Sequence, residues 1–99
     1  MTHAVVLLAI AEADLAEAKK WYRHCHPYLE TDLIRCVEET LTRIAHHPLS
    51  FARLTGEFRQ AFVHRFPYRI VFRLVADLIV IVAILHTSRH PRTWIARDH

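Results

Sequence analysis

The stretch YRIVFRLVADLIVIVAIL, residues 68–85, determines the fold class of this 99-residue chain. In its first part, apolar and basic residues alternate with a period of two, which is the pattern of a strand with one face on a core. In its last part, LIVIVAIL (78–85), every residue is apolar, which is typical of a central strand covered on both faces. The segment Val75-Ala76-Asp77-Leu78 between them predicts a tight turn. We therefore predict an antiparallel hairpin of two strands.

The turn also predicts which residues share a face. If it has two central residues, residue 73 pairs with 80, 71 with 82 and 69 with 84, and paired residues point to the same side. One side then carries Arg69, Val71, Arg73, Val80, Val82, Ile84 and His86. The other side, on which we expect helices to pack, carries Tyr68, Ile70, Phe72, Ile79, Ile81, Ala83 and Leu85. The first side is apolar at its centre and basic at its edges, so we expect another chain to dock on it.

Two further strands are predicted upstream. FRQAFVHRF (58–66) alternates in the same way, and Pro67 follows it where a missing N–H breaks no strand ladder. AVVLLAI (4–10) is a continuous apolar run that predicts a strand buried on both faces. We expect this first strand to pair with 78–86, because both are apolar on two sides. Residues 49–56 predict a loop that contains Gly56.

The segment between these strands has the apolar spacing of helices. The first helix runs from Glu12 to His26-Pro27, and its Asp14 and Glu17 have the spacing of a capping box. Thr31 or Asp32 can cap a second helix, which ends at Pro48. Their apolar stripes are Leu15, Ala18, Tyr22 and Cys25, then Ile34, Val37, Leu41 and Ile44. The predicted fold is α+β in the order β-α-α-β-β-β: one domain, residues 1–99, with an antiparallel helical hairpin on one face of a four-stranded, mainly antiparallel sheet.

Composition excludes several classes of protein. Hydrophobic residues make up 53% of the chain, which is typical of a globular domain. The apolar runs are too short to span a bilayer, and the N-terminus has no signal-peptide pattern, so we expect a cytoplasmic protein without membrane contact. Cys25 and Cys36 lack metal-type spacing, and we expect both to be reduced and buried. The nine histidines are not accompanied by residues that would complete a metal site, so we predict no metal and no cofactor.

Charge is distributed unevenly along the chain. Residues 1–50 hold seven acidic and five basic residues, whereas residues 51–99 hold eight arginines, no lysine and three acids. Arginine pairs bidentately with carboxylate or phosphate and stacks on rings. The basic half therefore points to an anionic partner, either nucleic acid or an acidic protein segment. A solvated basic surface fits the charge alone equally well.

Several segments together resemble one known family. GEFRQAFVHRFPYRIVFRL (56–74), VIVAILHTSRHPRTWIAR (80–97) and the helical segment 11–48 resemble the RelE/ParE superfamily of type II toxins, especially its ParE or plasmid-stabilisation branch. The family signature is an arginine before Phe-Pro-Tyr and then His-x-x-Arg-x-Pro-x-x-Trp. In this chain it is filled by Arg59, residues 66–68, His86, Arg89, Pro91, Trp94 and Arg97. Phe72 departs from the pattern, because the family commonly has tyrosine there.

The resemblance implies a bacterial toxin of a type II toxin–antitoxin system. A ParE-like toxin would inhibit growth by poisoning DNA gyrase and would be neutralised by a cognate antitoxin with an acidic amphipathic segment. The alternatives are a RelE-like ribosome-dependent mRNA endoribonuclease and a non-toxic interaction protein of the same fold. A nuclease would use Arg69, Arg73 and His86 for charge stabilisation and proton transfer. We favour a protein that is not an enzyme, because no lysine follows Lys20 and Trp94 stands where those nucleases have tyrosine.

The residues predicted to contact the antitoxin or the target are mostly basic. We expect antitoxin side chains, apolar anchors flanked by acids, to cover the face of Arg69, Arg73, Val82 and Ile84. Direct contact with nucleic acid is left open by the arginines. The complete predicted set is Arg59, Arg69, Arg73, Val82, Ile84, His86, Arg89, Trp94 and Arg97. Structural roles are the competing interpretation for His86 at the strand end, for Arg89 in an ion pair and for Trp94 in the core.

Overall fold

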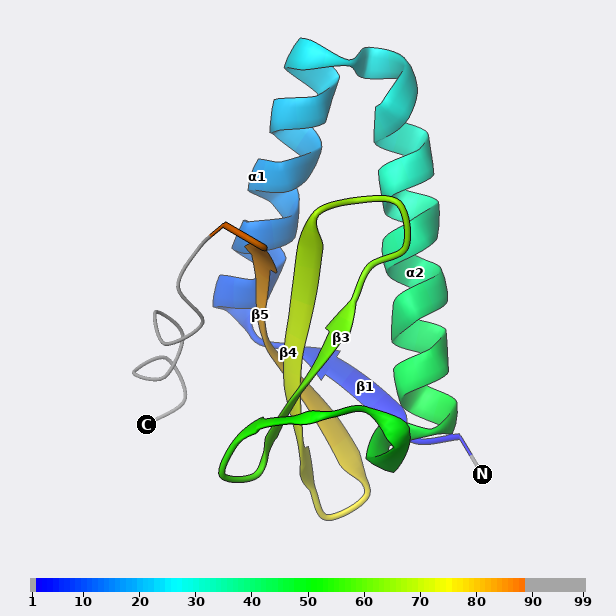
Figure 1. Ribbon diagram of the computed structural model, residues 1–99, viewed down its shortest axis with the longest axis vertical. Helices are drawn as coiled ribbons and strands as arrows, with labels where there is room; N and C mark the ends of the chain where they lie inside the picture. The colour runs from blue at the N-terminus through cyan, green and yellow to red at the C-terminus, as the bar shows by residue number, and fades with distance from the viewer. Residues whose placement is uncertain (1, 89–99) are drawn as a thin grey trace.

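A computed structural model describes residues 2–88 of the chain, in which two helices pack on one face of a five-stranded sheet (Figure 1). The strand order is β1-β5-β4-β3-β2; β1 is parallel to β5 and the other pairs are antiparallel. No helix in the described part is long and apolar enough to cross a membrane. The elements are β1 (Ala4–Leu7), α1 (Ala9–Cys25), a 3-10 turn (Pro27–Leu29), α2 (Glu30–His46), a second 3-10 turn (Pro48–Ser50), β2 (Arg53–Thr55), β3 (Phe58–Phe62), β4 (Tyr68–Val75) and β5 (Leu78–His86).

The predicted α+β fold with a helical hairpin on one face is confirmed, but the strand count was wrong. Part of the segment predicted as a loop forms β2, which pairs with β3 and adds a fifth strand. Gly56 follows β2 with a φ of 55°, a left-handed conformation that glycine adopts without a steric penalty. The tight turn allows a three-residue strand to form at the edge of the sheet. The strand predicted over 58–66 is also shorter, and ends at Phe62.

The first strand and the start of α1 also differ from the prediction. The predicted pairing with β5 is confirmed, but β1 ends at Leu7, lies at the sheet edge and leaves Val6 44% exposed. Strand pairing passes directly into helix, because the Leu8 N–H bonds the Ile81 carbonyl and the Leu8 carbonyl accepts from Glu12. The alanine-rich segment that follows favours helix. Asp14 therefore lies inside α1 and caps nothing, so the capping box was wrong.

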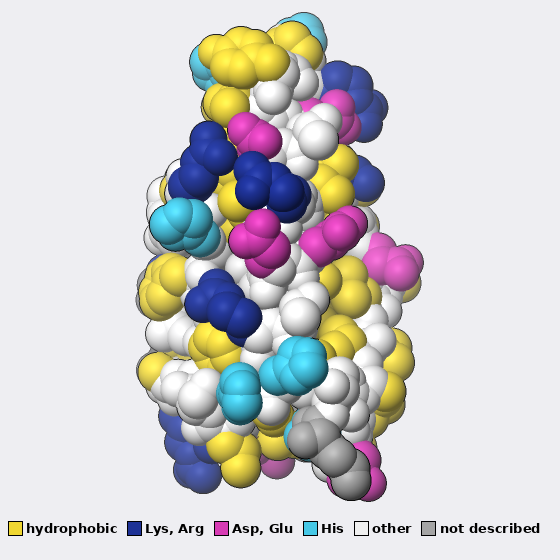
Figure 2. All heavy atoms as spheres, turned by 90° about the vertical axis from the view of Figure 1, so that its right-hand side faces the viewer, with side chains coloured by type: hydrophobic (Ala, Val, Ile, Leu, Met, Phe, Trp, Pro, Cys, Tyr) yellow, Lys and Arg dark blue, Asp and Glu magenta, His cyan; other side chains and the backbone are white. Residues whose placement is uncertain are grey.

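The two helices form the predicted antiparallel hairpin. Neither Thr31 nor Asp32 caps α2, because the 3-10 turn leads straight into the helix at Glu30. An ion pair between Arg23 Nη2 and Glu30 Oε2, 2.6 Å apart, joins the two helices at this end. Figure 2 shows basic and acidic side chains interspersed on the outward face of α2. Within α2, Arg35 pairs with Asp32 and Glu39, at three- and four-residue spacing.

The main core lies between the helices and the sheet. Its largest fully buried side chains include Phe72, Ile70, Ile79, Ile81, Leu33, Val37 and Ile44. Thr40 is buried among them, and its Oγ1 donates to the Cys36 carbonyl over 2.8 Å. Cys36 is buried as expected, but Cys25 is exposed at the end of α1, so the prediction of two buried thiols was wrong.

A β-bulge in the β4–β5 hairpin changes which residues share a face. Arg73 pairs with Val80 as predicted, but the register then shifts, and Val71 pairs with Ala83 while Arg69 pairs with Leu85. One extra residue in a strand reverses the side to which every later side chain points. The predicted positions of Ile84 and His86 beside the arginines were therefore wrong: both lie on the helix side. Ala83 and Leu85 lie on the opposite side.

The side of the sheet away from the helices has a small core of its own. It consists of Phe58, Val71, Val82, Ala83 and Leu85, with Leu8 and Leu54 packed against it. The apolar centre predicted for this face therefore exists, but Val71 and Val82 are 0% exposed. The accessible groups on this side therefore belong to residues around that core.

Candidate functional site

Two arginines of β4 lie on the sheet face away from the helices. The guanidinium carbon of Arg69 is 5.4 Å from the centre of the Phe62 ring, and that of Arg73 is 5.8 Å from the Phe58 ring. Arg73 also forms an ion pair with Glu57. Their position follows from the alternation of β4, which places every second residue on this side. Each guanidinium lies against an aromatic ring. The two positive charges on one face could attract an anionic partner.

Arg69 has an incomplete set of hydrogen bonds. Its Nη1 donates to Gln60 Oε1 over 3.0 Å and its Nη2 to the Thr87 carbonyl over 3.4 Å. Its Nε is buried and has no hydrogen-bond partner among residues 2–88. Phe62, next to this guanidinium, is 55% exposed. Arg69, Arg73, Gln60 and Phe62 are called the arginine face below, and they present planar donors beside an accessible ring.

Arg59 does not join the arginine face. It pairs with Phe72 across β3 and β4 and therefore points to the helix side. Its Nη1 donates to the Phe51 carbonyl over 2.7 Å, next to the second 3-10 turn. In the described structure Arg59 thus holds the chain between α2 and β2 against β3, which is a structural role.

His86 lies at the end of β5, on the helix side. Its ring packs edge-on against Tyr68 with 5.3 Å between ring centres. Its Nδ1 is 2.8 Å from Ser88 Oγ and accepts the Ser88 backbone N–H over 3.1 Å. An Nδ1 that accepts from a backbone N–H carries no proton in the neutral ring, so the proton is then on Nε2.

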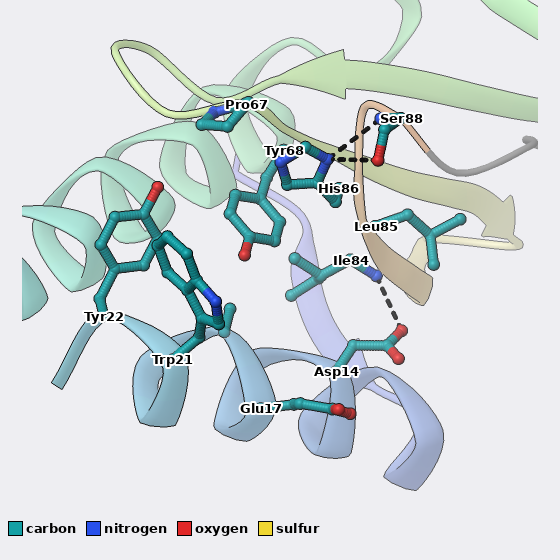
Figure 3. Close-up of a pocket in the computed structure, with 11 residues that line it drawn as sticks. Asp14, Glu17, Trp21, Tyr22, Pro67, Tyr68, Ile84, Leu85, His86 and Ser88 are labelled. Atoms are coloured by element: carbon teal, nitrogen blue, oxygen red, sulfur yellow. Dashed lines mark hydrogen bonds between the residues drawn. The ribbon is translucent and has the colours of Figure 1, made fainter. Parts of the chain in front are cut away.

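A pocket of about 440 Å³ separates His86 from α1 (Figure 3). Asp14 contributes a carboxylate whose Oδ2 accepts the Ile84 backbone N–H over 3.1 Å. Burial raises the pKa of the Tyr22 phenol, so this group stays protonated at neutral pH. The lining residues are Asp14, Glu17, Ala18, Trp21, Tyr22, Pro67, Tyr68, Ile84, Leu85, His86 and Ser88.

The structure separates residues that the sequence grouped together. Arg69 and Arg73 lie on one side of the sheet and His86 on the other, so these three nuclease candidates do not converge on one site. Val82 and Ile84 are 0% and 2% exposed and lie on different faces. Arg89, Trp94 and Arg97 are outside the described residues. Among residues 2–88, no three His, Cys, Asp or Glu side chains are grouped so that they could hold a metal ion.

The pocket beside α1 was not predicted from the sequence, because no single motif indicates it. Asp14, Glu17 and Trp21 are three and four residues apart, so they follow one face of a helix. An acidic and aromatic row of this kind is ambiguous in sequence, because it fits a solvated face as well as a pocket wall. Asp14 and Glu17 were instead interpreted as a helix cap.

A family model described as the ParE toxin of the type II toxin–antitoxin system parDE matches residues 5–91. The chain belongs to the ParE toxin family. It is thus a toxin of a type II toxin–antitoxin system. A search of curated proteins finds no match to this ParE-family toxin.

Solved structures agree with the fold of the ParE-family toxin. A chain of the chromosomal ParDE toxin–antitoxin system from P. aeruginosa superposes with a TM-score of 0.76 at 18% identity, covering 86% of this chain and 96% of that one. A chain of the toxin–antitoxin complex RelBE2 from Mycobacterium tuberculosis gives a TM-score of 0.60, also at 18% identity, covering 87% and 99%. At this identity the likeness concerns the fold alone.

Proposed function

We propose that this ParE-family toxin inhibits growth by poisoning DNA gyrase, and that it acts by binding and not by cutting RNA. The observation that carries the proposal is the position of His86 on the opposite side of the sheet from Arg69 and Arg73. Cleavage of RNA by its own 2′-hydroxyl needs a base, an acid and cationic support within hydrogen-bond reach of one phosphate. Side chains on two faces of a sheet do not meet that requirement together.

The local contacts of the candidate groups support the same proposal. Nδ1 of His86 is occupied by Ser88, and its ring packs against Tyr68. Glu57, an acid in the turn before β3, is paired with Arg73. These groups stabilise the strand ends, which is the structural role considered for His86 from the sequence.

The proposal is tested with His86→Ala. Loss of a general acid or base lowers a rate by about 10²–10⁴, whereas a toxin that works by binding should keep toxicity within a few-fold. Purified gyrase and a supercoiled plasmid should accumulate cleaved DNA with the wild type and with His86→Ala. Cells in which the toxin is induced should form filaments and show DNA-damage signals before translation stops.

Primer extension on mRNA from the same cells tests the nuclease alternative. Codon-specific cuts that vanish in Arg69→Ala or His86→Ala, but persist in the control Arg53→Ala on exposed β2, would establish the nuclease alternative instead. In that case, purified gyrase should also be unaffected by the protein.

We also propose that a cognate antitoxin covers the arginine face with an acidic amphipathic segment. The Arg69 guanidinium beside the exposed Phe62 ring supports this, because a carboxylate could pair with the cation while an apolar side chain packs on the ring. A toxin–antitoxin complex is the subject of the M. tuberculosis structure with the same fold. Since Val82 and Ile84 are buried, the exposed Phe62 ring offers the apolar surface on which the antitoxin's anchors would pack.

The antitoxin proposal is tested with the double variant Arg69→Glu/Arg73→Glu. Each hydrogen bond to a charged group contributes about 1.5–3 kcal/mol, so affinity measured by calorimetry should fall well over tenfold. Arg53→Glu makes half of this charge change away from the arginine face and should leave affinity within about twofold. An unchanged affinity of the folded double variant would remove the arginine face from consideration.

A further inference from the structure

The pocket between α1 and the end of β5, called the α1–β5 pocket below, has two chemically different walls. Asp14, Glu17 and Trp21 come from successive turns of α1. Tyr68 and His86 come from the facing ends of β4 and β5. Figure 3 shows the Trp21 indole lying between the helix and the sheet, with Glu17 beside Asp14. The pocket has a volume of about 440 Å³, which is ample for a long side chain.

The pocket lies beside the part of β5 that extends beyond its pairing with β1. β1 accompanies β5 only as far as the pair Leu7 and Ile81. Beyond it, the Ile84 N–H donates to Asp14 where a strand would otherwise accept it. The Thr87 N–H points the other way, to the Pro67 carbonyl beside β4. Because main-chain donors alternate along a strand, the N–H of His86 is directed to the same side as that of Ile84.

The pocket is acidic and aromatic in a chain whose net charge is +3. Glu17 is exposed and Trp21 is 52% exposed, while the Trp21 and Tyr22 rings are held edge-on with 4.8 Å between their centres. The Tyr22 ring in turn packs near the Tyr68 ring, with 6.4 Å between their centres. Aromatic faces attract cations, and a planar guanidinium both stacks on a ring and pairs with a carboxylate. Arginine combines these two properties.

We propose that the α1–β5 pocket binds an arginine side chain carried by an extended segment of a partner protein. The guanidinium lies against the Trp21 ring and pairs with the Glu17 carboxylate. The main chain of the segment follows the β5 edge at His86, whose N–H it accepts. This site differs from the arginine face in position and in sign of charge, so it does not depend on the gyrase or antitoxin proposals.

The test uses the full-length, ¹⁵N-labelled protein and two blocked tripeptides, Ac-Val-Arg-Val-NH₂ and Ac-Val-citrulline-Val-NH₂. Citrulline has nearly the shape of arginine but no charge. The arginine peptide should shift the Trp21 indole and His86 amide signals to saturation, and the citrulline peptide should bind at least tenfold more weakly. The chain has two tryptophans, so Trp21→Phe identifies the indole signal.

A matched pair of variants locates the charge. Glu17→Gln should lower the affinity for the arginine peptide by about tenfold, as expected when one charge-assisted pair is lost. Glu12→Gln, an exposed residue of the same helix outside the pocket, should bind like the wild type. Equal binding of the two peptides, or of the two variants, would overturn the proposal. An absence of peptide-induced shifts at a saturating concentration of the arginine peptide would overturn it as well.

Discussion

Replacing Asp14 by alanine should lower the free energy of unfolding by about 1–2.5 kcal/mol. Asp14 lies inside α1 and accepts the backbone N–H of Ile84, 70 residues away, at the edge of β5 that β1 leaves uncovered. A hydrogen bond to a charged group contributes about 1.5–3 kcal/mol. The better helix propensity of alanine returns about 0.5 kcal/mol. The Asp14 carboxylate thus accepts a backbone N–H of β5 that a neighbouring strand would otherwise accept.

Urea denaturation followed by circular dichroism measures the effect. With a slope of about 1–1.5 kcal/mol per molar urea for a domain of this size, the midpoint should fall by roughly 1–2 M. Asp14→Asn keeps a neutral acceptor and should fall between the wild type and Asp14→Ala. The control is Glu17→Ala, one turn further along the same helix on an exposed residue. If Asp14→Ala proves as stable as Glu17→Ala, the carboxylate does not hold the β5 edge.

Three further predictions concern stability and accessibility. Phe72→Ala should cost about 3–5 kcal/mol in the same denaturation assay, because it empties a fully buried site in the main core. The hydrogen bond from Arg23 keeps the pKa of Glu30 below its ordinary value of 4.5, so the stability it adds is complete above that pH and is lost as the pH falls through the lowered pKa. Glu30→Gln should accordingly flatten the dependence of Tm on pH in that acidic range, and an unchanged slope would contradict it. Alkylation of the native protein should modify exposed Cys25 and spare Cys36 until urea unfolds the chain; equal rates would contradict the burial of Cys36.

Some features of the site were accessible from the sequence, and others were not. The alternation of β4 predicted that Arg69 and Arg73 share a face, and the structure confirms it, because side-chain direction in a regular strand depends only on parity. The partner of each arginine could not be predicted, since Phe62 and Glu57 reach them from another part of the chain. The pocket beside Asp14 and Trp21 could not be predicted either, because its opposite wall comes from β5, which is distant in the sequence.

Sequence by itself determined the fold class of this protein. Period-two alternation in residues 68–74, the apolar run at 78–85 and two helical stripes are local patterns, and each depends only on backbone geometry and burial. The resemblance of its segments to the RelE/ParE superfamily predicted a toxin, and the family match over residues 5–91 confirms it.

Only the tertiary structure decided which side of the sheet each residue of β5 occupies. The bulge opposite Val71 and Phe72 has no marker in the sequence, because any of several apolar residues could take the extra position. Its effect is nevertheless large: it moves Ile84 and His86 to the helix side. The Ile84 N–H faces Asp14, and His86 is separated from the arginines, because adding one residue to a strand reverses the side of every residue after it.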